Sequence, residues 1–261
     1  MFGLKNYGGS CWLNACLQSL LRIPEVKERY STIDPEMTLN SVDKSLSKIW
    51  KTNGEEGLKD LFDAISESNT SESGSKPAYE MLAGKSIGDS NEAFVYLCDK
   101  LPFLDVLCRY NFVEKLECQC GFQQERPDSH IQFQLYPSNT KPMQLTECIL
   151  DVVKKETLDS WKCDKCSQRG QATKEIVMKT FPKVLTFKLF SDGGVIYPTN
   201  LVINSHKYQI YGITSFNGGH WWAFARDPSW VLYNDTSVRQ LRKNENPSGQ
   251  NAKMLIYYRI N

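Results

Sequence analysis

The sequence of 261 residues lacks any apolar run close to the roughly 18 residues that a membrane-spanning helix needs. It also lacks the pattern of a secretory signal peptide, so we expect an intracellular protein, cytoplasmic or nuclear, with no membrane partner. An excess of charge of either sign is missing too, since 31 lysine and arginine residues are balanced by 30 aspartate and glutamate residues. We therefore expect no general basic surface and no nucleic-acid partner.

The chain contains 41% apolar and 23% charged residues, as ordinary globular proteins do. Its length suits one large domain or two small ones, and either can bury an ample core. The nine cysteines are an odd number with uneven spacing. In a reducing compartment such a set indicates metal binding or catalysis, with the remaining cysteines as small core residues.

Helical spacing dominates the N-terminal part, as in Leu58, Phe62 and Ile65, and the polar run 67–76 predicts a surface loop. From about residue 108, short β-branched and aromatic runs replace this spacing. Strands are predicted at 110–116, 131–135, 176–178, 184–189, 208–215, 221–226, 230–233 and 253–259. We therefore predict an α+β protein, with a mostly helical N-terminal region followed by an antiparallel β-rich remainder.

The stretch 3–14 carries the first candidate for catalysis. A glycine-bearing turn leads into Cys11, and Leu13 and Leu17 begin an apolar pattern at helical spacing. Ser10 is a good helix-capping residue type, so Cys11 is predicted in the first helical turn. Free backbone N–H groups and the helix dipole there stabilise a thiolate and lower the pKa of a thiol. A buried structural cysteine is the alternative, and a partner histidine would decide between the two.

Of the three histidines, His220 has the most informative surroundings. Two glycines precede it and a β-prone aromatic run follows, which predicts a position at the mouth of a strand. The next apolar strand ends at Asn234 and Asp235, and a short turn joins the two strands into a hairpin. The hairpin would bring Asn234 or Asp235 near His220, where a catalytic base needs a third group to hold its tautomer. Taken alone, His220 is more typical of an ordinary surface or core histidine, and Asn234 with Asp235 is more typical of a turn.

Two cysteine pairs form a second constellation, Cys118 with Cys120 and Cys163 with Cys166. The second pair has the Cys-x-x-Cys spacing that is usual in tetrahedral zinc sites, and the first is one residue tighter. Both are flanked by turn residues, as in a zinc ribbon that joins two β-hairpins. We predict one structural zinc ion and no catalytic one, because four thiolates leave no open coordination position. Unligated cysteines are the alternative.

Together these motifs resemble those of the ubiquitin-specific proteases. The stretch 3–14 resembles the Cys box of the family and 208–235 resembles its His box. The run 89–94 is similar to an acidic helix of the family, and the cysteine pairs are similar to its zinc-bearing fingers. The stretches 181–185 and 253–260 resemble two of its strands. The resemblance spans nearly the whole chain in the order of the family.

The resemblance implies a papain-like cysteine protease with a helical thumb, a β-rich palm and zinc-ribbon-like β fingers. It implies one catalytic domain over 1–261, with the thumb at 1–105, the fingers and part of the palm at 106–190, and the palm sheet with the His box at 191–261. The expected activity is hydrolysis of the isopeptide or peptide bond after the C-terminal Gly-Gly of ubiquitin. The expected partners are ubiquitin, ubiquitinated proteins and an activating protein. A protease for a ubiquitin-like modifier, or a ubiquitin-binding scaffold with little activity, is the alternative.

The resemblance also implies a role for single residues. Cys11 would be the nucleophile, His220 the base and Asn234 the residue that orients the base, with Asp235 as a supporting polar group. Asn6 would donate to the oxyanion together with the backbone N–H of Cys11.

Three further residues are implied in substrate binding. Asp89 and Glu92 match positions that hold the arginine-rich C-terminal tail of ubiquitin, although a capping box explains the two residues equally well. Trp221 is expected to wall the channel for Gly-Gly, or else to belong to the core.

Overall fold

The computed structural model describes the chain except for residues 38–39, 68–87, 139, 171, 191–193, 248, 250 and 261. From residue 68 on, the predicted surface loop 67–76 lies outside the described residues. No described helix has the length and apolarity needed to cross a membrane.

The N-terminal part of the chain is helical, as predicted. Its helices are α1 (Cys11–Leu20), α2 (Pro24–Thr32), the short 3₁₀ helix η1 (Pro35–Met37), α3 (Ser41–Lys51), α4 (Leu58–Glu67), α5 (Ser90–Lys100) and α6 (Pro102–Cys108). Asn40 and Asp89 cap α3 and α5 through their side chains, whereas Pro24 and Pro102 stand in the first turn of α2 and α6. Local sequence thus fixes where these helices begin.

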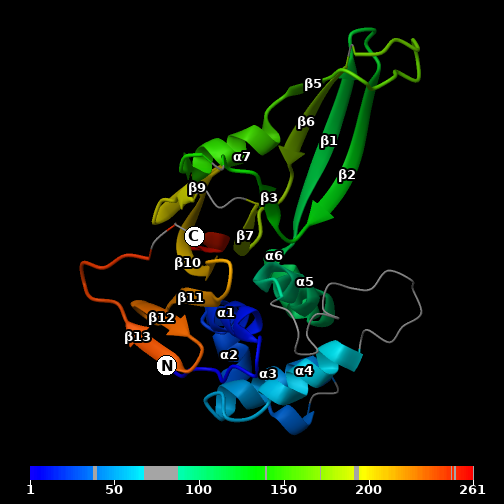
Figure 1. Cartoon of the computed structure of the whole chain (residues 1–261). Helices are drawn as coiled ribbons and strands as arrows, with labels where there is room; N and C mark the ends of the chain where they lie inside the picture. The colour runs from blue at the N-terminus through cyan, green and yellow to red at the C-terminus, as the bar shows by residue number, and fades with distance from the viewer. Residues whose placement is uncertain are drawn as a thin grey trace.

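Four strands form a sheet that extends away from the helices in Figure 1. They are β1 (Tyr110–Cys118), β2 (Gln123–His130), β5 (Glu156–Leu158) and β6 (Ala172–Met178), in the order β2-β1-β6-β5. All neighbours in this sheet are antiparallel. The turn between β1 and β2 and the segment between β5 and β6 meet at its far end, where the four predicted zinc ligands lie.

The second sheet has eight strands. They are β3 (Phe133–Leu135), β7 (Val184–Leu189), β9 (Asn200–Ile203), β10 (His206–Phe216), β11 (Trp221–Arg226), β12 (Trp230–Asn234), β13 (Ser237–Gln240) and β14 (Ala252–Arg259). The order is β13-β12-β11-β10-β14-β7-β3, with β9 paired to the outer part of β10. The short β4 (Met143–Gln144) and β8 (Val195–Ile196) pair separately, and α7 (Leu145–Val153) follows β4.

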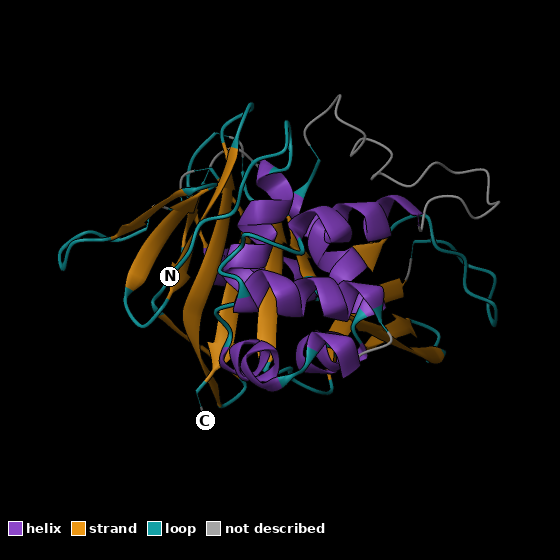
Figure 2. Cartoon of the chain, turned by 90° about the horizontal axis from the view of Figure 1, so that it is seen from below, coloured by secondary structure: helices purple, strands orange, loops and turns teal. Residues whose placement is uncertain are grey.

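Helix α1 packs against β10, β11 and β12 and against α5, and the N-terminal helices together cover one face of this sheet in Figure 2. All ten residues of α1 are buried. A helix that is buried on all sides belongs to the core. Helix α1 therefore holds the residues of its first turn, Cys11 included, in a fixed position. One buried cluster joins α1 to Phe94 of α5 and to Trp221 and Tyr233 of the sheet. A second cluster fills the other face of the sheet.

The structure confirms the α+β class and the predicted strands within a few residues, but it departs from the sequence-based prediction in several places. β2 is exposed, polar and contains Pro127, so neither its alternation nor its composition indicates a strand. It forms because its backbone pairs with β1 along eight residues. Helix α7 lies inside the part expected to be β-rich, and β3 pairs with β7 in parallel, so the remainder is not purely antiparallel.

Candidate active site

Cys11 is the first residue of α1 and is 2% exposed. Burial raises the pKa of its thiol, and the carboxylate of Asp235 raises it further. The backbone N–H groups of Cys11, Trp12 and Trp221 act in the opposite direction and lower it. The expected stabilisation by the helix N-terminus is therefore present, but desolvation outweighs it, and the predicted lowering of the pKa is wrong for this state. A thiol held protonated needs a base before it can attack.

Ser10 stands at the N-cap of α1, yet its side chain makes no capping bond. The hydroxyl oxygen accepts instead from the backbone N–H of Tyr7 at 2.9 Å, which folds the preceding loop. The loop therefore sets the place of Cys11, and a side-chain cap does not.

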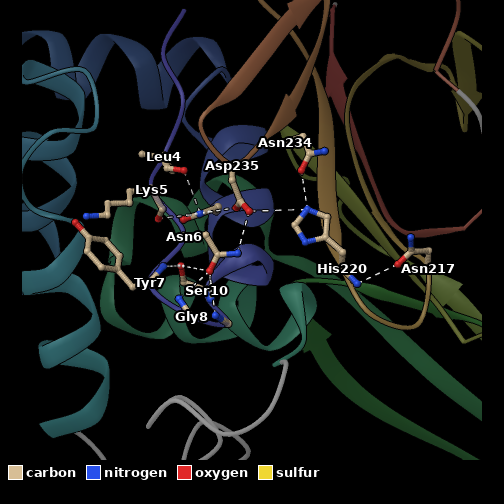
Figure 3. A network of polar contacts seen from close by, with 12 residues as sticks. Leu4, Lys5, Asn6, Tyr7, Gly8, Ser10, Asn217, His220, Asn234 and Asp235 are labelled. Atoms are coloured by element: carbon tan, nitrogen blue, oxygen red, sulfur yellow. Dashed lines mark hydrogen bonds and ion pairs between the residues drawn. The ribbon is translucent and has the colours of Figure 1, made fainter.

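His220 and Asn234 lie beside each other at the adjacent ends of two neighbouring strands (Figure 3). His220 immediately precedes β11, Asn234 ends β12, and the two strands are antiparallel. The Nε2 atom of His220 is 2.6 Å from Oδ1 of Asn234. An amide oxygen only accepts, so Nε2 carries the proton and donates it to this bond. The Nδ1 atom of a neutral ring is then unprotonated and free to accept a proton.

Asp235 joins this hairpin to the nucleophile helix. Its Oδ1 accepts from Nδ2 of Asn14 at 2.8 Å, and its Oδ2 accepts from Nδ2 of Asn6 at 2.9 Å. Oδ2 also lies 3.9 Å from Nε2 of His220, and the backbone oxygen of Asp235 accepts from the backbone N–H of Leu4. Figure 3 shows this carboxylate between the imidazole and the loop that leads to α1. One side chain thus connects the base, the loop and the helix.

Asn6 is held at both ends of its amide. Its Oδ1 accepts from the backbone N–H groups of Gly8, Gly9 and Ser10 at 2.9–3.1 Å, while one Nδ2–H donates to Asp235. Gly8 and Gly9 have φ of 79° and 122°, backbone values that glycine adopts without strain. The amide orientation is therefore fixed, and among the described residues its second Nδ2–H has no acceptor. The expected role as oxyanion donor fits this free N–H and stays a prediction.

Asn14 is the last residue of the stretch 3–14, and the sequence indicated no role for it. The structure shows it 2% exposed, one turn beyond Cys11, with its Nδ2 bonded to Asp235. A polar residue between Leu13 and Ala15, in a run whose apolar pattern indicates a buried helix, was the signal that could have found it.

Asp89 caps α5, with Oδ1 accepting from the backbone N–H of Asn91 at 2.7 Å. Glu92 does not complete the capping box, since its side chain returns no bond to the helix start in the described structure. Burial raises the pKa of Glu92, as does Asp89, whereas Lys188 lowers it. Both carboxylates remain partly accessible, and Lys188, which sequence reasoning missed, lies 3.5 Å from Oδ2 of Asp89.

Trp221 is 4% exposed and stacks on Phe216 with 4.8 Å between the ring centroids. Its position favours the core interpretation that the sequence left open, and does not favour a wall of an open channel. The contribution of Trp221 to the site is its backbone N–H, which lowers the pKa of the Cys11 thiol.

The four cysteines at the far end of the four-stranded sheet form a compact set. The sulfur atoms of Cys118, Cys120, Cys163 and Cys166 all lie within 4.8 Å of one another. The Cys118–Cys166 and Cys120–Cys163 sulfur distances are 3.8 and 3.7 Å. A tetrahedron with Zn–S bonds of about 2.3 Å has edges of about 3.8 Å. The cluster is therefore compatible with a structural zinc ion, and it includes the tight Cys-x-Cys pair.

Comparison with known proteins agrees with this geometry. The sequence profile described as ubiquitin carboxyl-terminal hydrolase matches residues 2–191. The chain belongs to the ubiquitin carboxyl-terminal hydrolase family. The resemblance seen in the sequence is thereby confirmed for the family.

Among curated members of this family, the chain is 27% identical over 165 residues to ubiquitin carboxyl-terminal hydrolase 4 of Eremothecium gossypii, covering 47% of this chain and 19% of that protein. It is 26% identical over 146 residues to ubiquitin carboxyl-terminal hydrolase 21 of Rattus norvegicus, covering 45% of this chain and 26% of that protein. The matched part is thus about a quarter or less of these relatives, so the activity, substrates and partners of this chain are proposals.

Among solved structures, a chain of the SAGA DUB module bound to monoubiquitin has a TM-score of 0.82 at 21% identity, covering 100% of this chain and 69% of that one. A chain of the SAGA Ubp8/Sgf11/Sus1/Sgf73 DUB module bound to ubiquitin aldehyde has a TM-score of 0.80 at 20% identity, covering 100% and 70%. At this identity the match shows the fold, and it confirms the predicted fold class.

Proposed function

We propose that this chain is a deubiquitinating thiol protease that hydrolyses the isopeptide or peptide bond after the C-terminal Gly-Gly of ubiquitin. The observation that carries the proposal is the bond between Nε2 of His220 and Oδ1 of Asn234, whose chain neighbours Trp221 and Asp235 both act on the thiol of Cys11 at the start of α1. A scaffold that only binds ubiquitin has no need for this tautomer-setting contact. Membership of the family is consistent with the activity.

The first step is attack by Cys11 on the carbonyl carbon of the terminal glycine. Because Nε2 of His220 already donates to Asn234, Nδ1 is the atom that takes the thiol proton. The C–S bond forms, and the tetrahedral intermediate collapses as His220 returns a proton to the leaving lysine amine. Water, deprotonated by the same ring, then hydrolyses the thioester and releases the carboxylate and the thiol.

The oxyanion would lie at the start of α1. The backbone N–H of Cys11 belongs to the first helical turn, where amides have no partner within the helix. The second Nδ2–H of Asn6 is the other donor in our proposal, since the first is bonded to Asp235. Two donors that are already in place can stabilise the negative charge on the oxyanion as it develops, without reorganisation of the site.

The basic tail of ubiquitin would approach Asp89 and Glu92 at the N-terminus of α5. Two partly accessible carboxylates one helical turn apart suit the arginines of such a tail. The four-cysteine cluster would hold one zinc ion that fixes the end of the four-stranded sheet and takes no part in the chemistry. The division into thumb, fingers and palm, the intracellular location and an activating protein partner remain parts of the proposal.

The test is hydrolysis of a ubiquitin C-terminal fluorogenic amide by the wild type and by Cys11→Ala, His220→Ala and Asn234→Ala. We expect turnover by the wild type, none by the first two variants, and a large fall in kcat in the third because the ring loses its orientation. A folded wild type that releases no fluorophore, alone or after zinc addition, would contradict the proposal. Cleavage of the matching substrate of a ubiquitin-like modifier with higher kcat/KM would instead select that alternative.

A further inference from the structure

Lys188 interacts with Asp89 and Glu92, the two acidic residues that we propose bind the basic tail of ubiquitin. Nζ of Lys188, on β7, lies 3.5 Å from Oδ2 of Asp89 at the start of α5. The same ammonium group acts on Glu92, where it opposes the effects of burial and of Asp89 on the carboxyl group. One cation from the eight-stranded sheet therefore offsets part of the charge of two carboxylates on a helix.

The two oxygens of Asp89 have separate partners. Oδ1 accepts from the backbone N–H of Asn91 at 2.7 Å and from its Nδ2 at 2.9 Å, so it is committed to the helix start. Oδ2 is the oxygen left for a cation, and Lys188 takes it. Glu92 has no hydrogen-bond or ion-pair partner for its carboxylate in the described part of the chain. Removing Lys188 would thus free Oδ2 while the capping bonds keep Asp89 in place.

Lys188 also has a second favourable contact. Its Nζ lies 4.8 Å from the centroid of the Phe190 ring, and Phe190 stacks on Tyr136 at 4.8 Å between centroids. Both rings are exposed, at 43% and 67%. A cation is attracted to a ring face, so the ammonium can give up Asp89 to another cation and remain stabilised.

We propose that Lys188 is a specificity-determining residue, an internal counterion that competes with the cationic C-terminal tail of ubiquitin for Asp89 and Glu92. This inference rests on the proposed function. A cationic tail can replace the Lys188 ammonium at Asp89 and form an ion pair in its place. A tail without positive charge would separate Lys188 from Asp89 and form no ion pair in return, so the lysine keeps the carboxylates closed to such a tail.

The first test measures binding alone, in chains that carry Cys11→Ala and cannot react. Lys188→Gln in this background is expected to lower the Kd for ubiquitin about two- to five-fold at low salt, the range typical of a partly exposed ion pair. The difference shrinks as salt is added, because screening weakens the freed carboxylates' attraction for the tail. Lys188→Arg keeps the positive charge and keeps the Kd of the parent.

Two further variants separate competition from a purely structural role. In the Asp89→Asn background, Lys188→Gln is expected to lose most of its effect on the Kd, since residue 89 then has no negative charge for Lys188 and the tail to compete for. Lys48→Gln is the matched control, because Lys48 is a partly exposed lysine 3.3 Å from a carboxylate of Asp60 on the α3–α4 helices. This variant should leave the Kd unchanged.

The second test repeats the series as kinetics in chains that retain Cys11, where Lys188→Gln should lower KM by the same factor and leave kcat unchanged. An equal or higher Kd for Lys188→Gln, an effect that persists in Asp89→Asn, or a complete lack of ubiquitin binding in every variant overturns the inference. Failure of the proposed function is distinguishable: the wild type then releases no product, while the binding series still shows the gain in Lys188→Gln.

Discussion

The Nδ2 atom of Asn14 lies 2.8 Å from Oδ1 of Asp235, and this bond joins the nucleophile helix to the hairpin that carries the base and its partner. The two residues are 221 positions apart in the sequence, and the Asn14 side chain is buried. The bond explains how Cys11, near the start of the chain, and His220, near its end, are held in a fixed position relative to each other. Figure 3 shows Asp235 beside the imidazole of His220.

Asn14→Ala tests this connection. It leaves Oδ1 of Asp235 without its buried donor, so we expect the free energy of unfolding to fall by about 1–3 kcal/mol. We also expect kcat to fall with little change in KM, because the position of the base relative to Cys11 changes and the tail site does not. Chemical denaturation and steady-state kinetics measure the two effects. A variant with wild-type kcat would show that the bond stabilises the fold but does not position the site.

Asn6→Ala removes the proposed side-chain donor to the oxyanion. Loss of one such donor typically costs about 2.7–4 kcal/mol of barrier, so kcat should fall by about 10²–10³ while KM stays close to wild type. Ser10→Ala is the control, because it removes the bond from the Tyr7 N–H and the 3.5 Å contact of the Ser10 hydroxyl with Oδ1 of Asn6, but keeps Nδ2 of Asn6 and its bond to Asp235. If both variants lose activity equally, loop geometry and not the Nδ2–H is what matters.

The raised pKa of Cys11 predicts how the resting thiol reacts. Burial and Asp235 favour the protonated form, and only the thiolate reacts with iodoacetamide. Alkylation of Cys11 should therefore be slow near pH 7 and should still increase above pH 9. Peptide mass spectrometry identifies the product at Cys11. A rate at Cys11 that is already constant below pH 7 would instead indicate a thiolate–imidazolium pair before substrate binds.

The sulfur cluster predicts one zinc ion per chain by metal analysis. Cys163→Ser should lose it, and the melting temperature should fall, because the metal links the β1–β2 turn to the segment between β5 and β6. Cys148→Ser, a cysteine outside the cluster, is the control for loss of a thiol. A metal-free wild type that melts at the same temperature with and without added zinc would contradict this.

Residues whose role follows from a short sequence pattern around them were predictable. Cys11 at a helix start, His220 and Asn234 at two ends of one hairpin, and Asp89 at a helix cap all follow from short patterns, and the structure places each where its pattern indicates. The close set of four sulfurs follows from spacing in the same way.

Effects that depend on distant parts of the chain were not predictable. The pKa of Cys11 is decided by burial under strands more than 200 residues away, and Asn14 gains its partner only in the folded chain. Lys188 meets Asp89 across elements about one hundred residues apart. The polar strand β2 forms through pairing with β1 and not through its own composition. Local patterns contain none of this information.

The central claim is that Cys11 is a nucleophile aimed at the C-terminus of ubiquitin. The most direct measurement is the intact mass of the chain after incubation with ubiquitin that carries a C-terminal thiol-reactive group. We expect a single adduct of one ubiquitin on the wild type, mapped to Cys11 by peptide analysis, and none on Cys11→Ala although the exposed Cys120 remains. No adduct on a folded wild type, or an equal adduct on both proteins, would contradict the account.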